Sequence, residues 1–381
     1  METKETKETK ETKKALCAMS GGVDSSVAAY IMKNKGYECS GATMRLYYND
    51  ELGLCNMRTC CSKKDIDDAQ DVCFELDIPY EVLDYTDDFE NKIIKKFINT
   101  YEEGNTPNPC IDCNRYMKFE KMLEYAMDNG IDYIVTGHYA RIEYNENTGR
   151  YELKKGIDAT KDQSYVLYSL TQEQLAHTMF PLGELTKAEV RVIAEDMSFI
   201  NARKHDSQDI CFVPDGDYVK FIKEYMGKTY EPGEFVDTDG NVLGTHQGII
   251  KYTIGQRKGL GIAFGKPMYV CGKDMENNRV ILGEEKDLYS KGLYCNNINW
   301  ISVPELKGEL KAAAKVRYTK KEEPATLMEI DSEEFEREKL PEDAIKVIFD
   351  EKQRAITPGQ AVVFYDGDTV VGGGTIIRAV D

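Results

Sequence analysis

The chain has 381 residues, enough for two or three domains, and its content of 41% hydrophobic and 30% charged residues is that of an ordinary soluble globular protein. No apolar run approaches the ~20 residues that a membrane-spanning helix needs, so we expect no membrane partner. The net charge of −18 argues against a nucleic acid partner, because phosphate binders usually carry a basic face, although basic residues can still gather locally.

The cysteines and the N-terminus indicate where the chain works. Eleven cysteines without the apolar core of a signal peptide predict a reducing, cytoplasmic setting, where thiols serve catalysis or metals rather than crosslinks. Residues 1–14 form a polar tail of alternating charge, which we expect to be disordered and exclude from the fold. Cys55, Cys60 and Cys61 form a cluster whose role is open. Metal binding is one alternative, although companion histidines are missing.

The first predicted elements form a phosphate site. The apolar run 15–19 predicts a buried strand, the loop SGGVDSS follows at 20–26, and an amphipathic helix runs on to Gly36. Two glycines let the backbone approach an anion, which the hydroxyl and N–H groups at the helix start then bind with the help of the helix dipole. Asp24 has no place against bare phosphate unless a cation intervenes, so we predict that it is associated with Mg²⁺.

The loop lacks the lysine of a Walker A motif and instead resembles the PP-loop of the ATP pyrophosphatases. Those enzymes cleave ATP between its α- and β-phosphates and leave adenylate on a substrate. The resemblance therefore implies ATP and Mg²⁺ as ligands. The alternative is a tight strand-to-helix turn without a ligand, which a lone pair of glycines would indicate.

Short apolar runs and helical patterns alternate up to residue 215 and predict an α/β fold with a doubly wound parallel sheet. The predicted strands lie at 40–46, 80–84 and 132–136, and the predicted helices at 65–76, 88–101 and 116–129. Thr186–Glu189 is a capping box that opens one more helix.

Beyond Pro214 the composition changes, because glycine and proline become denser and alternating patterns indicate β structure. After the tail at 1–14 we predict a PP-loop ATP pyrophosphatase catalytic domain, a small linking domain and a C-terminal β-barrel. Their predicted bounds are 15–215, 216–285 and 286–381.

Three cysteines in two segments of the chain carry candidate sulfur chemistry. Cys110 and Cys113 form a C-x-x-C motif in a predicted loop before a helix, and a cysteine beside Arg115 near a helix N-terminus has thiolate character. The alternatives are a thioredoxin-like motif or half of a zinc site, although four scattered histidines disfavour a closed four-ligand site. Cys211 lies between charged residues where the α/β region ends. Taken alone, it would more often be a small buried hydrophobe.

Seven motifs in order resemble those of the tRNA-specific 2-thiouridylases: SGGVDSS, TPNPCIDCNRYMKF, TGHYA, KDQSYVLYSL, HDSQDICF, YTIGQRKGLGI and KVRYT. The resemblance covers essentially the whole chain beyond the tail. It implies ATP-dependent 2-thiolation of the wobble uridine in tRNA, by adenylation of the uracil 2-carbonyl and sulfur transfer from a cysteine persulfide, with release of AMP and pyrophosphate. The implied partners are the tRNAs for Lys, Glu and Gln and a sulfur-carrier protein or cysteine desulfurase.

The resemblance also implies roles for individual residues. Cys211 carries the persulfide, and Cys113 is the nucleophile that pairs with it in a transient disulfide. The positions that match ATP contacts are Ala18, Met19, Ser20, Gly21, Gly22, Val23, Asp24, Ser25, Met44 and Gly137. The positions that match tRNA contacts, the first three in the target-base loop, are Asn108, Pro109, Cys110, Lys161, Asp162, Gln163, Arg317 and Tyr318. Met44 could equally fill the core, Arg317 and Tyr318 could be a pair on the barrel face, and His138 receives no catalytic role.

One departure from the family leaves the mechanism open. Family members often carry Asp where this chain has Cys110, so Cys110, Cys113 and Cys211 could together hold a [4Fe–4S] cluster with one open iron. Such a cluster would replace the disulfide role of Cys113 without changing the reaction. Two remoter alternatives are a PP-loop ligase that acts on a small metabolite and a non-catalytic RNA binder that senses redox state or metal.

Overall fold

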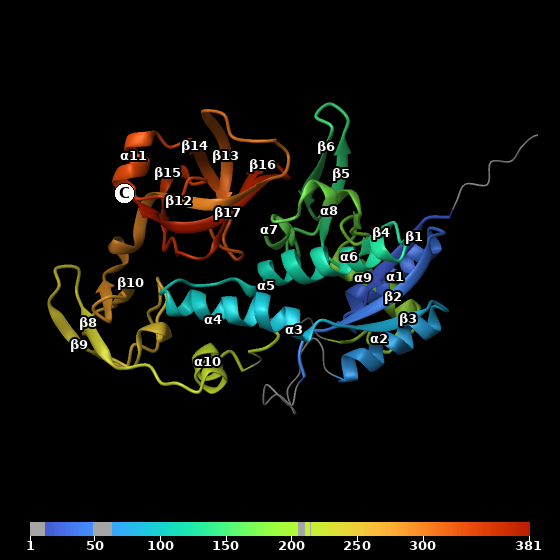
Figure 1. The fold of residues 1–381 in the computed structure, drawn as a ribbon, viewed down its shortest axis with the longest axis horizontal. Helices are drawn as coiled ribbons and strands as arrows, with labels where there is room; N and C mark the ends of the chain where they lie inside the picture. The colour runs from blue at the N-terminus through green and yellow to red at the C-terminus, as the bar shows by residue number, and fades with distance from the viewer. Residues whose placement is uncertain (1–11, 49–62, 205–209, 214) are drawn as a thin grey trace, which may run out of the picture.

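Figure 1 shows the elements of the computed structural model, which describes residues 12–48, 63–204, 210–213 and 215–381. The cysteine cluster within 55–61 and the motif segment 205–209 lie outside this described part. None of the helices in it combines the length and the apolar character that crossing a membrane requires.

The N-terminal part is built on a five-stranded parallel sheet with the order β3-β2-β1-β4-β7. Its strands are β1 (Lys14–Ala18), β2 (Glu38–Arg45), β3 (Tyr80–Asp84), β4 (Tyr133–Val135) and β7 (Thr178–Met179). From β1 the chain adds β2 and β3 on one side and then crosses back to β4 on the other. The switch point of the sheet therefore lies between β1 and β4, where ligands bind beyond the carboxyl ends of the strands.

The sheet is covered on both faces, which confirms the predicted doubly wound α/β fold. Leu16 packs with Phe119 and Met122 on one face, while Ala15 and Cys17 pack with other helices on the opposite face, as alternating strand residues must. The shorter helices are α1 (Val23–Asn34), α2 (Lys63–Glu75), α7 (Ser164–Leu167), α8 (Gln172–Ala176), α9 (Lys187–Asp196) and α10 (Tyr218–Met226). Strand β1 begins at Lys14, inside the segment that we assigned to the tail, because Lys14 pairs with β2.

Two longer helical runs contain π-helical segments. The first consists of α3 (Thr86–Phe89), η1 (Glu90–Ile94) and α4 (Lys95–Glu102), and the second of α5 (Pro109–Asp112), η2 (Cys113–Lys121) and α6 (Met122–Asp128). The second run begins at Pro109, where we predicted a loop, because proline presets the backbone angle of a first helical turn. The C-x-x-C motif thus lies inside the helix, and our loop assignment was wrong.

The remaining chain is mostly β structure. A middle sheet has the order β10-β11-β8-β9, and six strands in the order β12-β15-β14-β13-β16-β17 close into a barrel because β12 pairs with β17. The strands are β8 (Gly233–Val236), β9 (Val242–His246), β10 (Tyr269–Asp274), β11 (Arg279–Gly283), β12 (Tyr289–Trp300), β13 (Glu309–Lys315), β14 (Glu323–Met328), β15 (Ile345–Arg354), β16 (Ala361–Asp366) and β17 (Thr369–Val380). The short helices of this part are η3 (Ile249–Lys251), η4 (Glu285–Leu288) and α11 (Ser332–Glu338).

A hairpin of the N-terminal part joins the barrel to the parallel sheet. It consists of β5 (Ala140–Asn145) and β6 (Arg150–Lys155), and Lys154 pairs with Thr369 of β17. In Figure 1 this hairpin stands between the parallel sheet and the orange-red barrel, above the helix α5–α6 run. The barrel is therefore fixed beside the carboxyl edge of the sheet, where the candidate site lies.

Candidate active site

The loop after β1 leaves the start of helix α1 open. Gly22 is the N-cap residue of α1 and makes no side-chain capping hydrogen bond to the helix. The first N–H groups of α1 are therefore available to an anion. The Ser25 hydroxyl accepts a hydrogen bond from the Ser20 N–H at 3.2 Å and donates to the Gly22 carbonyl at 2.9 Å. The Ser26 hydroxyl donates to the same carbonyl at 3.1 Å. These two hydroxyls shape the loop, and its backbone N–H groups are left to bind the ligand.

Glycine is required at two places beside this helix start. Gly21 adopts φ +69°, and a Cβ atom there would lie 2.3 Å from the carbonyl oxygen of Asp65. A Cβ atom on Gly137, which follows β4, would lie 2.7 Å from the carbonyl carbon of Asp24 and 2.8 Å from the nitrogen of Ser25. The loops after β1 and β4 therefore meet at the switch point without room for a side chain between them.

Asp24 is held by two groups that come from distant parts of the chain. The Lys187 ammonium lies 2.7 and 2.8 Å from its two carboxylate oxygens, and the Tyr139 hydroxyl donates to Oδ1 at 2.8 Å. Lys187 opens α9 directly after Thr186, whose capping box with Glu189 is confirmed by both of its hydrogen bonds. The site therefore holds a carboxylate and an ammonium side by side at the start of α1.

A second lysine, Lys204, binds the glycine loop through a backbone carbonyl. The Lys204 ammonium donates to the Gly21 carbonyl at 2.9 Å and to the carboxylates of Asp65 and Asp68 at 2.6 and 2.7 Å. Burial alone would lower the pKa of Lys204, but the hydrogen bonds to Asp65 and Asp68 outweigh it and raise this pKa. Asn201 adds a bond to Gly21 at 3.2 Å. The loop conformation is thus set before any ligand arrives.

A cavity of about 540 Å³ opens at the carboxyl ends of β1, β2 and β4. Its lining combines the loop after β1, the start of the α5–α6 run, the segment around Cys211 and one barrel residue, Tyr318. The predicted site residues that line it are Ala18, Met19, Ser20, Asp24, Ser25, Met44, Asn108, Pro109, Cys110, Cys113, Gly137, Gln163, Cys211 and Tyr318. Those that do not line it are Gly21, Gly22, Val23, Lys161, Asp162 and Arg317.

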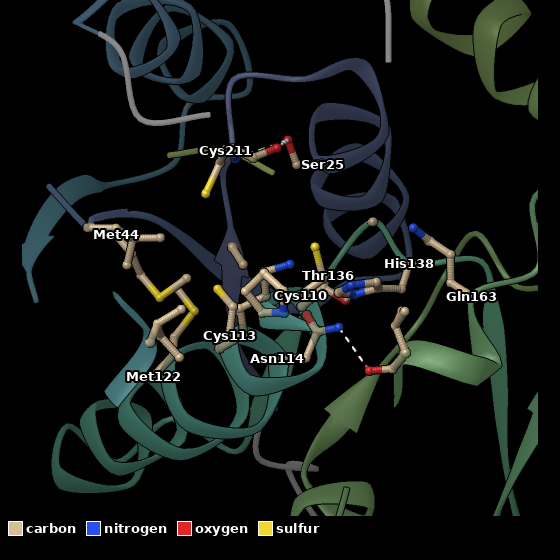
Figure 2. A pocket seen from close by; sticks show the side chains of 18 of the residues that line it. Ser25, Met44, Cys110, Cys113, Asn114, Met122, Thr136, His138, Gln163 and Cys211 are labelled. Carbon is tan, nitrogen blue, oxygen red and sulfur yellow. Dashed lines mark hydrogen bonds between the residues drawn. The ribbon is translucent and has the colours of Figure 1, made fainter. Parts of the chain in front are cut away.

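The three cysteines of interest reach this cavity from different elements. Figure 2 shows Cys110 and Cys113 on the helix at one side and Cys211 on the opposite side. Cys110 is exposed, while Cys113 and Cys211 are half-buried. The Tyr47 hydroxyl donates to the Cys211 carbonyl at 2.9 Å, and the next residue, Phe212, is anchored in an aromatic cluster. Cys211 is therefore held at the cavity by buried neighbours on both sides.

The described residues contain no group of three or more His, Cys, Asp or Glu side chains close enough to hold a metal ion. Cys110, Cys113 and Cys211 are therefore not a preformed three-ligand set for a [4Fe–4S] cluster in the described part of the chain. We therefore derive no step through such a cluster. A single carboxylate is a ligand that Mg²⁺ accepts, since that ion keeps several waters and shares its ligands with substrate phosphates. Asp24 stays our predicted ligand, and the Lys187 ammonium on both of its carboxylate oxygens would have to share it with the ion.

Residues predicted to touch tRNA form a small network at the rim. The Tyr318 hydroxyl donates to the Asp162 carbonyl at 3.2 Å, which links the barrel to the N-terminal part of the chain. The Asp162 carboxylate accepts hydrogen bonds from the Gly156 and Ser164 N–H groups, at 3.2 and 3.1 Å. Gln163 accepts one from the Tyr139 N–H at 2.9 Å. Asp162 and Gln163 thus shape the rim, while Tyr318 presents an exposed ring.

Arg317 has a different environment from the exposed one that we expected for a tRNA contact. Its Nη2 donates to the carbonyls of Ile254 and Ala355 at 3.1 and 3.2 Å and to the Thr357 hydroxyl at 2.6 Å. Burial lowers the pKa of Arg317. Ile254 belongs to the middle domain and Ala355 and Thr357 to the barrel, so the half-buried guanidinium connects these two domains.

His138 lines the cavity as a neutral ring. Burial, and secondly the nearby Lys118 ammonium, hold its pKa well below the usual value. Its Nδ1 lies 2.7 Å from the Thr136 hydroxyl, and Phe119 and Phe180 pack around the ring.

Sequence reasoning missed three residues of the site. Lys187 lies inside a capping box that we recognised, but the motif carries no sign that its ammonium reaches Asp24. Asn114 and Lys118 follow Cys113 on the cavity side of η2, and their spacing of four residues is the only sequence signal for a shared helix face. Lys118 supplies a positive charge to the cavity wall.

The parallel sheet, the open helix start and the thiols around one cavity define a PP-loop protein with a HUP domain. The chain matches three family models: the tRNA methyl transferase HUP domain over residues 13–215, the tRNA methyl transferase PRC-barrel domain over 219–284 and the aminomethyltransferase beta-barrel domain over 290–376. It belongs to the family of the tRNA-specific 2-thiouridylases, as similarity to curated relatives shows over nearly the whole length.

Two such relatives carry the name tRNA-specific 2-thiouridylase MnmA. The protein of Acetivibrio thermocellus is 52% identical over 364 residues, which is 95% of this chain and 99% of the relative. That of Clostridioides difficile is 49% identical over 367 residues, 96% of this chain and 99% of the relative. Among solved structures, a 4-thiouridine synthetase–RNA complex with bound ATP covers 56% of this chain and 50% of its own, at 16% identity and a TM-score of 0.37, a likeness that supports no functional argument.

Proposed function

We propose that this protein is an ATP-dependent tRNA-uridine 2-sulfurtransferase. One observation carries the proposal. The PP-loop, at the uncapped start of α1, lines the same cavity as Cys110, Cys113 and Cys211. The family supplies the substrate, tRNA with a wobble uridine. The test is mass analysis of nucleosides from tRNA incubated with the enzyme, Mg-ATP, and a cysteine desulfurase with cysteine as the source of persulfide sulfur. Formation of 2-thiouridine is the expected result, and its absence would contradict the proposal.

The first half of the proposed reaction activates the base. The 2-carbonyl oxygen of uracil is a poor leaving group and must be activated before sulfur can replace it. It attacks the α-phosphate of ATP, and pyrophosphate departs. The N–H groups at the start of α1 and the Ser20 hydroxyl bind the phosphates, and Lys187 adds a positive charge beside them. Asp24 would hold Mg²⁺, and that ion would neutralise charge on the phosphates.

The second half moves the sulfur. Cys211 receives a sulfur atom from a sulfur-carrier protein or a cysteine desulfurase and holds it as a persulfide. The terminal sulfur attacks C2 of the activated base, and AMP leaves with the former carbonyl oxygen. The Cys113 thiolate attacks the inner sulfur of Cys211, which breaks the persulfide bond and forms a disulfide. A thiol reductant then returns both cysteines to thiols.

Substitution of Cys110 distinguishes this persulfide relay from the cluster mechanism. In the relay it is a neighbour of the target base, and since relatives often carry Asp there, Cys110→Asp is expected to retain most thiolation activity. The assay is 2-thiouridine formation, with iron and sulfide analysis of anaerobically purified wild type and variant. An inactive Cys110→Asp protein that has lost the iron found in the wild type would overturn the relay.

The tRNA contacts give a second prediction, in which Lys161 and Arg317 behave differently. Lys161→Ala is expected to weaken binding of several tRNAs similarly and to reduce the slope of log affinity against log salt by about one. Arg317→Ala is expected to leave this slope unchanged and to lower the unfolding temperature, because Ile254 of the middle domain and Ala355 and Thr357 of the barrel lose the guanidinium that bonds to all three. Salt-dependent tRNA binding and thermal unfolding of both variants measure the contrast. The opposite pattern would return Arg317 to the tRNA surface.

The remoter alternatives make different predictions for labelled ATP. A PP-loop ligase acting on a metabolite would form AMP without tRNA, and a non-catalytic sensor would form none with or without it. We propose tRNA-dependent AMP formation.

We also propose the division into catalytic, linking and barrel domains at 15–215, 216–285 and 286–381, with the first domain extended to Lys14, where β1 begins.

A further inference from the structure

One buried acceptor in the cavity lacks a donor. Asn114, the residue after Cys113 in η2, lines the cavity with only 3% of its surface exposed. Its side-chain nitrogen donates to the Val166 carbonyl at 3.0 Å, but its side-chain oxygen accepts no hydrogen bond from any residue that the structure describes. A buried acceptor without a donor is costly, so this oxygen points to a donor that a ligand brings.

The orientation of the amide follows from its contact with Val166. A carbonyl oxygen can only accept, so the amide atom that faces it must be the nitrogen, and the oxygen must face the other way. Figure 2 shows the nitrogen turned along the dashed line and the oxygen turned toward the other side chains drawn around the cavity. The hydrogen bond to the Val166 carbonyl thus fixes the amide with Oδ1 turned toward the ligand that occupies this part of the cavity.

The position of Asn114 narrows the choice of donor. Phosphate groups offer only acceptors and would be repelled by Oδ1, so the PP-loop end of the ligand does not explain it. Asn114 instead adjoins Cys113 and the target-base segment that begins at Asn108. Uracil carries an N–H donor at N3, the ring atom bonded to the C2 carbon that the sulfur must reach. A group that holds N3–H therefore lies beside the reacting carbon.

We propose that the Asn114 side-chain oxygen accepts the N3–H of the target uracil and thereby selects uracil against cytosine. This inference rests on the proposed 2-thiolation. Cytosine has a lone pair at N3 in place of the hydrogen, so it would set two acceptors face to face with no water to separate them. Asn114 is thus a specificity-determining residue, and its bond to Val166 fixes the acceptor in place.

The test compares Asn114→Ala with the wild type on two tRNAs that carry uridine or cytidine at the wobble position. Single-turnover formation of 2-thiouridine and 2-thiocytidine is measured by nucleoside mass analysis. We expect the variant to thiolate uridine about tenfold more slowly and cytidine faster than the wild type does, because the repulsion is gone. The ratio of the two rates does not depend on the fraction of folded enzyme.

Asn299→Ala is the matched control. Asn299 also donates to carbonyls of the neighbouring segment, those of Tyr168 and Leu170 at 2.7 and 2.9 Å, but it does not line the cavity. Its substitution is expected to leave the uridine-to-cytidine ratio unchanged. The proposal is overturned if Asn114→Ala slows both substrates by the same factor, if it forms no 2-thiocytidine, or if it raises only the KM for ATP. A wild type that forms no 2-thiouridine would instead refute the proposed function.

Discussion

Asp24→Ala is expected to reduce ATP cleavage and tRNA thiolation by on the order of 10²-fold or more, the scale of losing preorganised electrostatic stabilisation. Asp24 is the one carboxylate among the described residues that line the cavity. Its removal takes away the predicted Mg²⁺ ligand. It also takes away the acceptor that holds the Lys187 ammonium at 2.7 Å and the Tyr139 hydroxyl at 2.8 Å.

The measurement is AMP and pyrophosphate release over a range of Mg²⁺ concentrations. Asp24→Asn, which keeps the size of the side chain, should also require more Mg²⁺ for half-maximal rate, whereas a purely structural role would lower the rate at every Mg²⁺ concentration alike. Asp158→Asn is the matched control, since Asp158 accepts the Lys187 backbone N–H at 3.0 Å without lining the cavity. Full AMP production by the purified Asp24→Ala protein would refute the assignment.

The second large effect concerns the thiols. Cys113→Ser and Cys211→Ser are each expected to eliminate 2-thiouridine formation, because a serine hydroxyl carries no persulfide and forms no disulfide. Base activation precedes sulfur transfer in the proposed reaction, so tRNA-dependent pyrophosphate release should persist in both variants. Mass spectrometry of the intact proteins should detect an extra sulfur on Cys113→Ser, in which Cys211 is still present, and none on Cys211→Ser.

Cys271→Ser is the control for these two variants. Cys271 is a half-buried thiol of β10 in the middle domain, outside the cavity, and its loss should leave thiolation unchanged. Wild-type rates of 2-thiouridine formation in either Cys113→Ser or Cys211→Ser would contradict the relay. Loss of pyrophosphate release together with thiolation would mean that the substitution had damaged the nucleotide site as well.

Local features of this protein were open to prediction from the sequence by itself. The strand, the SGGVDSS loop and the helix behind it follow from residues close in the chain, and the capping box at Thr186 and the strand at Tyr80–Asp84 are confirmed. Apolar periodicity and turn residues encode backbone conformation directly. The helix that carries Cys110 and Cys113 was placed too late, because a C-x-x-C stretch after Pro109 gives no periodic apolar signal.

Only the tertiary structure decided which distant groups meet. Asp24 and Lys187 are 163 residues apart, and Asn114 and Val166 are 52 apart, yet each pair forms a direct hydrogen bond. The same holds for Arg317, whose type and neighbours suit a surface cation but whose guanidinium is enclosed by segments from two other regions. A periodic pattern states which side of an element is apolar. Which partner a polar side chain finds depends on how the chain crosses the sheet and closes the barrel, and no local pattern encodes that.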